Sequence, residues 1–80
     1  MLTSITQLRG REVVCTADGN RLGFVEDVEI DMDSGIARAL LVPGRARLFG
    51  REQLVIPWSD IVRFGEEIIL VSRPPQARRE

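Results

Sequence analysis

Five carboxylates lie close together in the sequence and offer the oxygen ligands that a metal site would need: Glu26, Asp27, Glu29, Asp31 and Asp33. The segment DMDSG at 31–35 begins like a calcium-binding loop, which holds its ion through carboxylate and carbonyl oxygens. However, Ile36 stands where an EF-hand loop requires glycine, and Val42 stands where it requires a bidentate acid. The pattern therefore favours a solvated carboxylate face on a hairpin, and we expect no metal and no cofactor.

An Arg-rich loop between two glycines, GRARLFG at 44–50, is the second group with chemical potential. Arg45 and Arg47 suit acidic groups of a partner, and Leu48 with Phe49 suits an apolar pocket, with Phe49 as the anchor. Alternatively, Leu48 and Phe49 fold back to close one end of the domain while the arginines stay solvated. Both interpretations remain open from the sequence. The first makes these four residues the candidate partner-binding site.

Residues that could carry catalysis are scarce. Cys15 is the only cysteine, and the chain has no His, Tyr or Lys that could activate a nucleophile. The neighbours Val13, Val14 and Thr16 make Cys15 a core residue. We therefore expect no catalytic residues, and an enzyme is the least favoured class.

The charge balance bears on nucleic-acid binding. The formal net charge is −1 and the sequence pI is about 5.4, which argues against broad binding to a phosphate backbone. The alternative hypothesis is a small-barrel protein that binds RNA or associates with the translation apparatus. It would use Arg45, Arg47 and Arg51 for phosphates and Phe49 for stacking.

Short apolar segments separated by turn residues must position these groups, and that pattern is typical of an all-β barrel or sandwich. Thr3 or Ser4 can cap a helical turn that runs through Leu8. We expect one domain at 1–71 and a flexible, charged tail at 72–80. The expected strands cover residues 12–17, 23–32, 36–42, 52–58, 61–64 and 68–71.

Three of the expected strands are apolar on both faces, at 39–42, 54–56 and 68–71. A small antiparallel barrel has one interior, so something must cover part of its outside. Either the N-terminal turn or a second copy of the chain would do so, and we expect a homodimer. Because no membrane-spanning run or signal peptide is evident, we expect a cytoplasmic protein with no membrane contact.

The apolar alternation shifts between Val25 and Val28, which predicts a β-bulge. In that interpretation Asp27 accepts hydrogen bonds from backbone amides that the bulge frees.

Trp58, at the end of an apolar strand after Pro57, is expected to pack in the core.

Several separated blocks occur in one order along the chain: LGFVEDVEID at 22–31, SGI at 34–36, LVPG at 41–44, VIPWSDI at 55–61, Gly65, and ILV at 69–71. Together they resemble the PRC-barrel domain over about residues 8–71, and most of all its short, stand-alone, sporulation-associated members of the YlmC/YmxH type. The resemblance implies a six-stranded β-barrel that works as a protein-interaction module with an unidentified protein partner. It carries no established biochemical activity, and the loop at 44–50 is shorter than in several relatives. The positions that we assign to the fold are Gly23, Asp27, Gly35, Gly44, Pro57 and Trp58.

Overall fold

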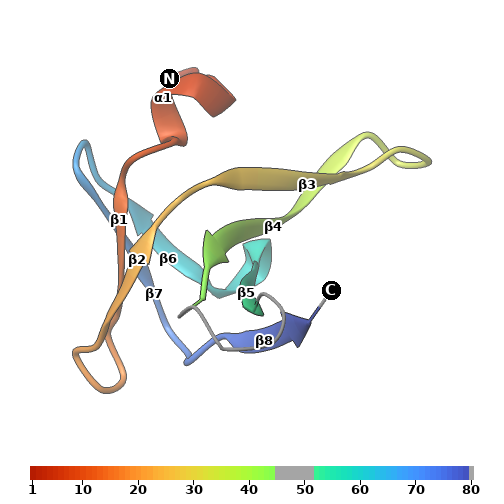
Figure 1. The fold of residues 1–80 in the computed structure, drawn as a ribbon. Coiled ribbons are helices and arrows are strands. Elements are labelled where there is room, and N and C mark those ends of the chain that lie inside the picture. Colours follow the sequence, from red (N-terminus) through yellow and green to blue (C-terminus); the bar gives the residue numbers. More distant parts are fainter. Residues whose placement is uncertain (45–51, 80) are drawn as a thin grey trace.

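The structure is a computed structural model that describes residues 1–44 and 52–79, and Figure 1 shows its fold. These residues form one short α-helix, one 3-10 turn and eight strands. The elements are α1 (Ile5–Leu8), β1 (Glu12–Cys15), β2 (Arg21–Phe24), β3 (Asp27–Asp31), β4 (Ile36–Pro43), β5 (Glu52–Pro57), η1 (Trp58–Asp60), β6 (Ile61–Phe64), β7 (Ile68–Val71) and β8 (Gln76–Arg79). The expectation of a mostly β domain is therefore confirmed.

The strands form two four-stranded sheets, which we call sheet A and sheet B. Sheet A has the order β2-β1-β7-β6, and sheet B has the order β3-β4-β5-β8. All pairings are antiparallel except that of β1 with β7, which is parallel. The prediction of a six-stranded antiparallel barrel is thus wrong in the number of strands, in closure and in the parallel pairing of β1 with β7.

The strand expected at 23–32 is divided because the chain passes from one sheet to the other at Val25 and Glu26. The Val25 N–H donates to the Arg11 carbonyl at 3.0 Å, before β1, whereas the Glu26 N–H donates to the Leu41 carbonyl at 2.8 Å, in β4. Val25 itself is buried. Consecutive residues therefore bond to different sheets, and this separates β2 from β3.

The core lies between the two sheets. Sheet A contributes Val13, Cys15, Ile69 and Val71, and sheet B contributes Leu40, Val42 and Ile56. Cys15 is fully buried, in agreement with its predicted place in the core. Leu8 of α1 joins the same cluster, and Ser4 caps this helix by accepting a hydrogen bond from the Gln7 N–H at 3.1 Å.

The end of the chain differs from the flexible tail expected at 72–80. Gln76–Arg79 forms β8, which pairs with β5 along the edge of sheet B. Pro74 and Pro75 precede this strand, where the lack of N–H groups does not interrupt the ladder. The edge of β5 supplies the backbone partners that a charged segment cannot find on its own.

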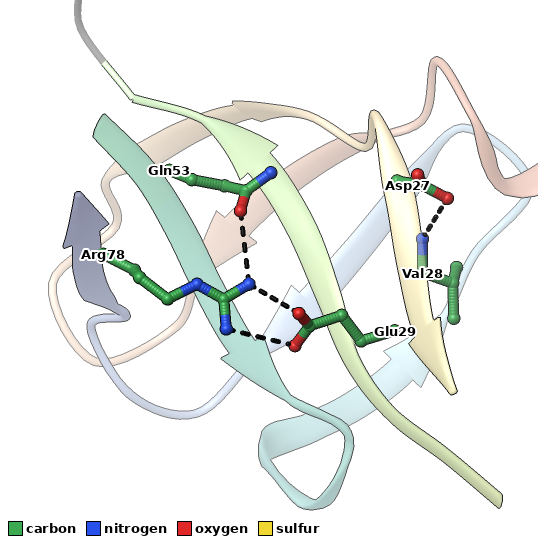
Figure 2. A network of polar contacts seen from close by, with 5 residues as sticks. All are labelled: Asp27, Val28, Glu29, Gln53 and Arg78. Carbon is green, nitrogen blue, oxygen red and sulfur yellow. Dashed lines mark hydrogen bonds and ion pairs between the residues drawn. The ribbon is translucent and has the colours of Figure 1, made fainter. Parts of the chain in front are cut away.

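A polar bridge joins the two outer strands of sheet B on the face away from the core, as Figure 2 shows. The Arg78 guanidinium on β8 donates to both carboxylate oxygens of Glu29 on β3, and to Gln53 Oε1 at 3.2 Å. Leu41 on β4 and Val55 on β5 are paired and point to this same face. The register places them between Glu29 and Arg78 along the strand direction, so the bridge crosses their position. The chain's own polar side chains thus lie across the apolar outer surface of this sheet, and Leu41 keeps only 7% of its surface exposed.

Candidate interaction surface

The outer face of sheet A, which is the face turned away from the core, carries a group of apolar and charged side chains. Residues that stand directly opposite each other in a sheet point to the same face. Glu12 is paired with Phe24 and Ile68, and Val14 is paired with Arg21 and Leu70. Leu70 is also paired with Arg63. The outer face of sheet A therefore consists of Glu12, Val14, Arg21, Phe24, Arg63, Ile68 and Leu70.

The apolar members of this face are open to solvent in the isolated chain. Phe24 keeps 56% and Ile68 keeps 43% of its surface exposed, and Val14 and Leu70 are half-buried. On the opposite face of the same sheet, Val13 and Ile69 have no exposed surface. Val14, Leu70 and Ile68 lie in neighbouring positions of β1 and β7, and Phe24 stands on the other side of Glu12. Exposed apolar side chains gathered on one face are the usual mark of a contact surface.

One ion pair holds two charges of this face together. The Arg21 guanidinium donates from Nη2 to Glu12 Oε1 at 2.7 Å and from Nε to Glu12 Oε2 at 2.8 Å. The hydrogen bonds from Arg21 hold the pKa of the Glu12 carboxyl below its ordinary value, and the bonds to Glu12 raise the pKa of Arg21. Such a bidentate pair fixes both side chains in one geometry across β1 and β2.

Among the other charges on and around this face are Arg63 on β6 and Glu66, which lies in the β6–β7 turn near Phe24 and Ile68. Neither makes an ion pair within residues 1–44 and 52–79, and both are exposed. A positive and a negative group at the border of an apolar face are available for a partner.

The pKa of Glu12 predicts how stability depends on pH. A carboxyl with a lowered pKa in the folded state stabilises the fold above its unfolded pKa, and this stabilisation is lost as the pH falls through the folded pKa. We therefore expect the urea midpoint to fall as the pH decreases below the ordinary value of 4.5. Glu12→Gln should have a flatter urea midpoint over this interval than the wild type. The same pH dependence in both proteins would contradict a stabilising role for the Glu12–Arg21 pair.

The predicted partner-binding residues Arg45, Arg47, Leu48 and Phe49 lie outside the described residues, as does Arg51. Whether Phe49 is an anchor or a lid stays a prediction. The described ends of this loop do come close together: a Cβ on Gly44 would lie 2.8 Å from the Cβ of Glu52, so glycine permits the close approach of β4 and β5.

Two other glycines that the sequence assigned to the fold have positive φ angles. Gly35 has a φ of 72° in the turn between β3 and β4. Gly23 in β2 has a φ of 123°, and a Cβ there would lie 3.0 Å from Val42 Cγ1. Gly23 thus lets β2 approach β4 at the point where the two sheets meet.

Asp27 accepts a hydrogen bond at Oδ1 from the Val28 N–H at 2.8 Å, as Figure 2 shows. The register shift between β3 and β4 lies between Glu29 and Ile30, further along than the alternation at 25–28 placed it.

Pro57 ends β5, and Trp58 starts η1. Trp58 packs against the core in half-buried form, and its ring centroid lies 5.4 Å from that of Phe64.

The carboxylate of Asp31, just before the turn of the hairpin, is bound by groups of the protein itself. Asp31 Oδ1 accepts from the Asp33 and Ser34 N–H groups at 2.9 and 3.3 Å, and these bonds hold the pKa of Asp31 below its ordinary value. Arg38 pairs with the other oxygen of Asp31 at 3.4 Å. No group of three metal-ligating side chains occurs in residues 1–44 and 52–79.

The hairpin of β3 and β4 extends away from the rest of the domain in Figure 1 and exposes Ile30, Met32 and Ile36. These side chains are separated by the charged residues of the turn, so they form a less continuous apolar area than the outer face of sheet A. The described residues include no helix with the length and apolarity that a bilayer crossing needs.

Sequence reasoning recognised part of the outer face of sheet A. The apolar run at 68–71 was predicted to have two apolar faces, and Ile68 and Leu70 are its outer members. Phe24 was missed because only the register of β2 with β1 shows which face it occupies.

Comparison with known proteins now adds the family. The sequence pattern of the PRC-barrel domain matches residues 3–78. The chain belongs to the PRC-barrel domain family. This PRC-barrel chain is 35% identical over 74 residues to the "Probable sporulation protein YlmC" of Bacillus subtilis, across 88% of the chain and 91% of that protein. It is also 29% identical over 72 residues to an uncharacterised protein of Clostridium acetobutylicum, across 86% of the chain and 83% of that protein.

Proposed function

We propose that this PRC-barrel chain is a non-enzymatic protein-interaction module that binds its partner through the outer face of sheet A. The module works in the cytoplasm as an adaptor, in a process connected with sporulation. The observation that carries the proposal is the exposed pair Phe24 and Ile68, which flanks Glu12 on the two strands beside β1.

The difference between the two sheets supports this choice of surface. On sheet B, the bridge from Arg78 to Glu29 lies across the apolar outer residues. On sheet A, the ion pair of Arg21 with Glu12 lies over β1 and β2 at one side and leaves Phe24 and Ile68 largely exposed. Exposed apolar area of this kind is stabilised by contact with a partner, because the contact removes it from water.

The residues available for chemistry support binding over catalysis. The thiol of Cys15 is buried in the core, and the carboxylates of Glu12, Glu29 and Asp31 are bound to arginines. The alternative of RNA binding rests on residues 45–51, and no described contact favours it. The sporulation context comes from the relative in Bacillus subtilis, whose name states it.

A photo-crosslinking amino acid at position 24 tests the proposal in sporulating cells. The matched control carries the same amino acid at position 32 on the hairpin, where Met32 is 90% exposed. We expect a discrete protein adduct from position 24 and only diffuse labelling from position 32. The same adducts from both positions, or none from position 24, would show that the outer face of sheet A is not the contact surface.

A further inference from the structure

We propose that the partner on the outer face of sheet A is a second copy of this chain, related by a two-fold axis that runs across the strands. The inference rests on the proposed function, because it needs this face to be a contact surface. It adds the identity of the partner, the orientation of the two copies and the residues that meet.

Symmetry limits how two copies can stack through this face. In a two-fold dimer, the same surface of both copies forms the contact. When two sheets lie face to face, the axis lies between them. If their strands are nearly aligned, the axis runs approximately across the strands or approximately along them. Packed sheets stand about 10 Å apart with strands rotated by about 30°, so facing positions follow from the register.

An axis across the strands places each strand over the same strand of the partner, in the opposite direction. The face has two levels along the strands, one with Phe24 and Ile68 and the other with Arg21, Leu70 and Arg63. The two-fold rotation brings the level of Phe24 and Ile68 in one copy over the level of Arg21, Leu70 and Arg63 in the other. Ile68 then packs on the partner's Leu70, and Phe24 lies under the partner's Arg21.

The charged groups fit this orientation. Gly65 pairs with Ile68 at the start of the β6–β7 turn, so Glu66 lies beside the first level at the β6 edge. Arg63 on the second level then stands opposite the partner's Glu66, and the contact is made twice. Arg21 over the ring of the second copy's Phe24 is a favourable cation–π arrangement. The two hydrogen bonds from Arg21 keep the Glu12 carboxylate paired when the contact removes it from water.

An axis along the strands gives an unfavourable arrangement. It places β2 over the partner's β6, so Arg21 stands opposite the partner's Arg63, and this also occurs twice. Like charges that face each other in an interface are strongly disfavoured. The charges of the face therefore select the axis across the strands.

The area of the outer face of sheet A sets the expected strength of the dimer. Four strands of four residues cover a footprint of about 19 by 13 Å. This is smaller than a standard interface of about 800 Å² on each partner, so we expect a weak dimer that forms with rising concentration.

Sedimentation equilibrium of the full chain from about 5 to 500 μM tests the inference. We expect a monomer–dimer equilibrium for the wild type. Arg63→Glu and Glu66→Arg should each weaken it by about tenfold or more, because each places like charges opposite each other twice. The matched control is Asp33→Arg on the hairpin, which should leave the equilibrium unchanged. At the lowest concentration, where monomers predominate, circular dichroism melting curves of all variants should match that of the wild type.

Mixing the two single variants gives the decisive result. In a mixed dimer, the carboxylate introduced by R63E would face the guanidinium introduced by E66R. At the other contact the native Glu66 and Arg63 would face each other, so association should return. The double variant R63E/E66R should also dimerise with itself. A wild type that stays monomeric throughout the range, or variants that do not restore association when mixed, would overturn the inference.

This failure is distinguishable from failure of the proposed function. If the chain is a monomer but position 24 crosslinks to a different protein, the outer face of sheet A is still the contact surface, and only the second copy is wrong. If position 24 gives no adduct and the chain is a monomer, both are wrong.

Discussion

Leu40→Ala should lower the free energy of unfolding by about 3 kcal/mol. Leu40 is fully buried in β4, where it stands opposite Val28 and Ile56. Truncation removes apolar contacts and leaves a cavity that two flanking strands cannot fill. A domain of this size has a small total stability, so the loss should be visible as a large decrease of the urea midpoint.

Ile36→Ala is the matched control for this substitution. Ile36 lies in the same strand, but 52% of its surface is exposed because it stands at the far end of the hairpin. Its truncation should change the free energy of unfolding by less than about 1 kcal/mol. Equal losses for the two variants would contradict the assignment of the core to the centre of β4.

Gly23→Ala should lower the free energy of unfolding by about 2 kcal/mol. The φ of 123° at Gly23 is a conformation that L-residues rarely adopt, and the added methyl group would lie 3.0 Å from Val42 Cγ1. Either β2 must move away from β4, or the side chain of Val42 must leave its place in the core. Chemical denaturation measures this loss.

Gly19→Ala separates the two contributions. Gly19 also has a positive φ, of 73°, but a Cβ there would meet nothing within 4 Å. Its variant should lose about 1 kcal/mol, from the backbone conformation alone. If Gly19→Ala destabilises the protein as much as Gly23→Ala, the close approach of β2 to β4 is not important for stability.

The sequence was sufficient for elements whose signals are local. The strands at Ile61–Phe64 and Ile68–Val71 have the bounds that turn residues and apolar runs predicted. Ser4 caps α1 as expected. These features depend on residues within a few positions of each other, so the sequence pattern contains them.

Features that depend on distant partners were predicted wrongly or not at all. The division at Val25 and Glu26 requires hydrogen bonds to Arg11 and Leu41, far away in the sequence. The strand β8 requires the edge of β5, and its charged residues give no apolar pattern of their own. Together the two features account for the difference between the six expected strands and the eight observed.

The candidate site likewise combines features with a local sequence signal and features that depend on distant partners. The two apolar faces of the run at 68–71 were recognisable, because four consecutive apolar residues in a strand place apolar side chains on both of its faces. The partners of this run on the outer face came from the parallel pairing of β1 with β7 and the antiparallel pairing of β1 with β2. Parallel pairing between the first and the seventh strand has no local signal in the sequence.

A dilution series of the backbone amide spectrum, from about 1 mM to about 20 μM protein, tests most directly whether the outer face of sheet A closes on a second copy. We expect concentration-dependent shifts at Val14, Arg21, Phe24, Ile68 and Leu70. The amides of the hairpin from Ile30 to Ile36 should stay unchanged. Shifts confined to the hairpin or to sheet B, or a spectrum that does not change with concentration, would contradict the account.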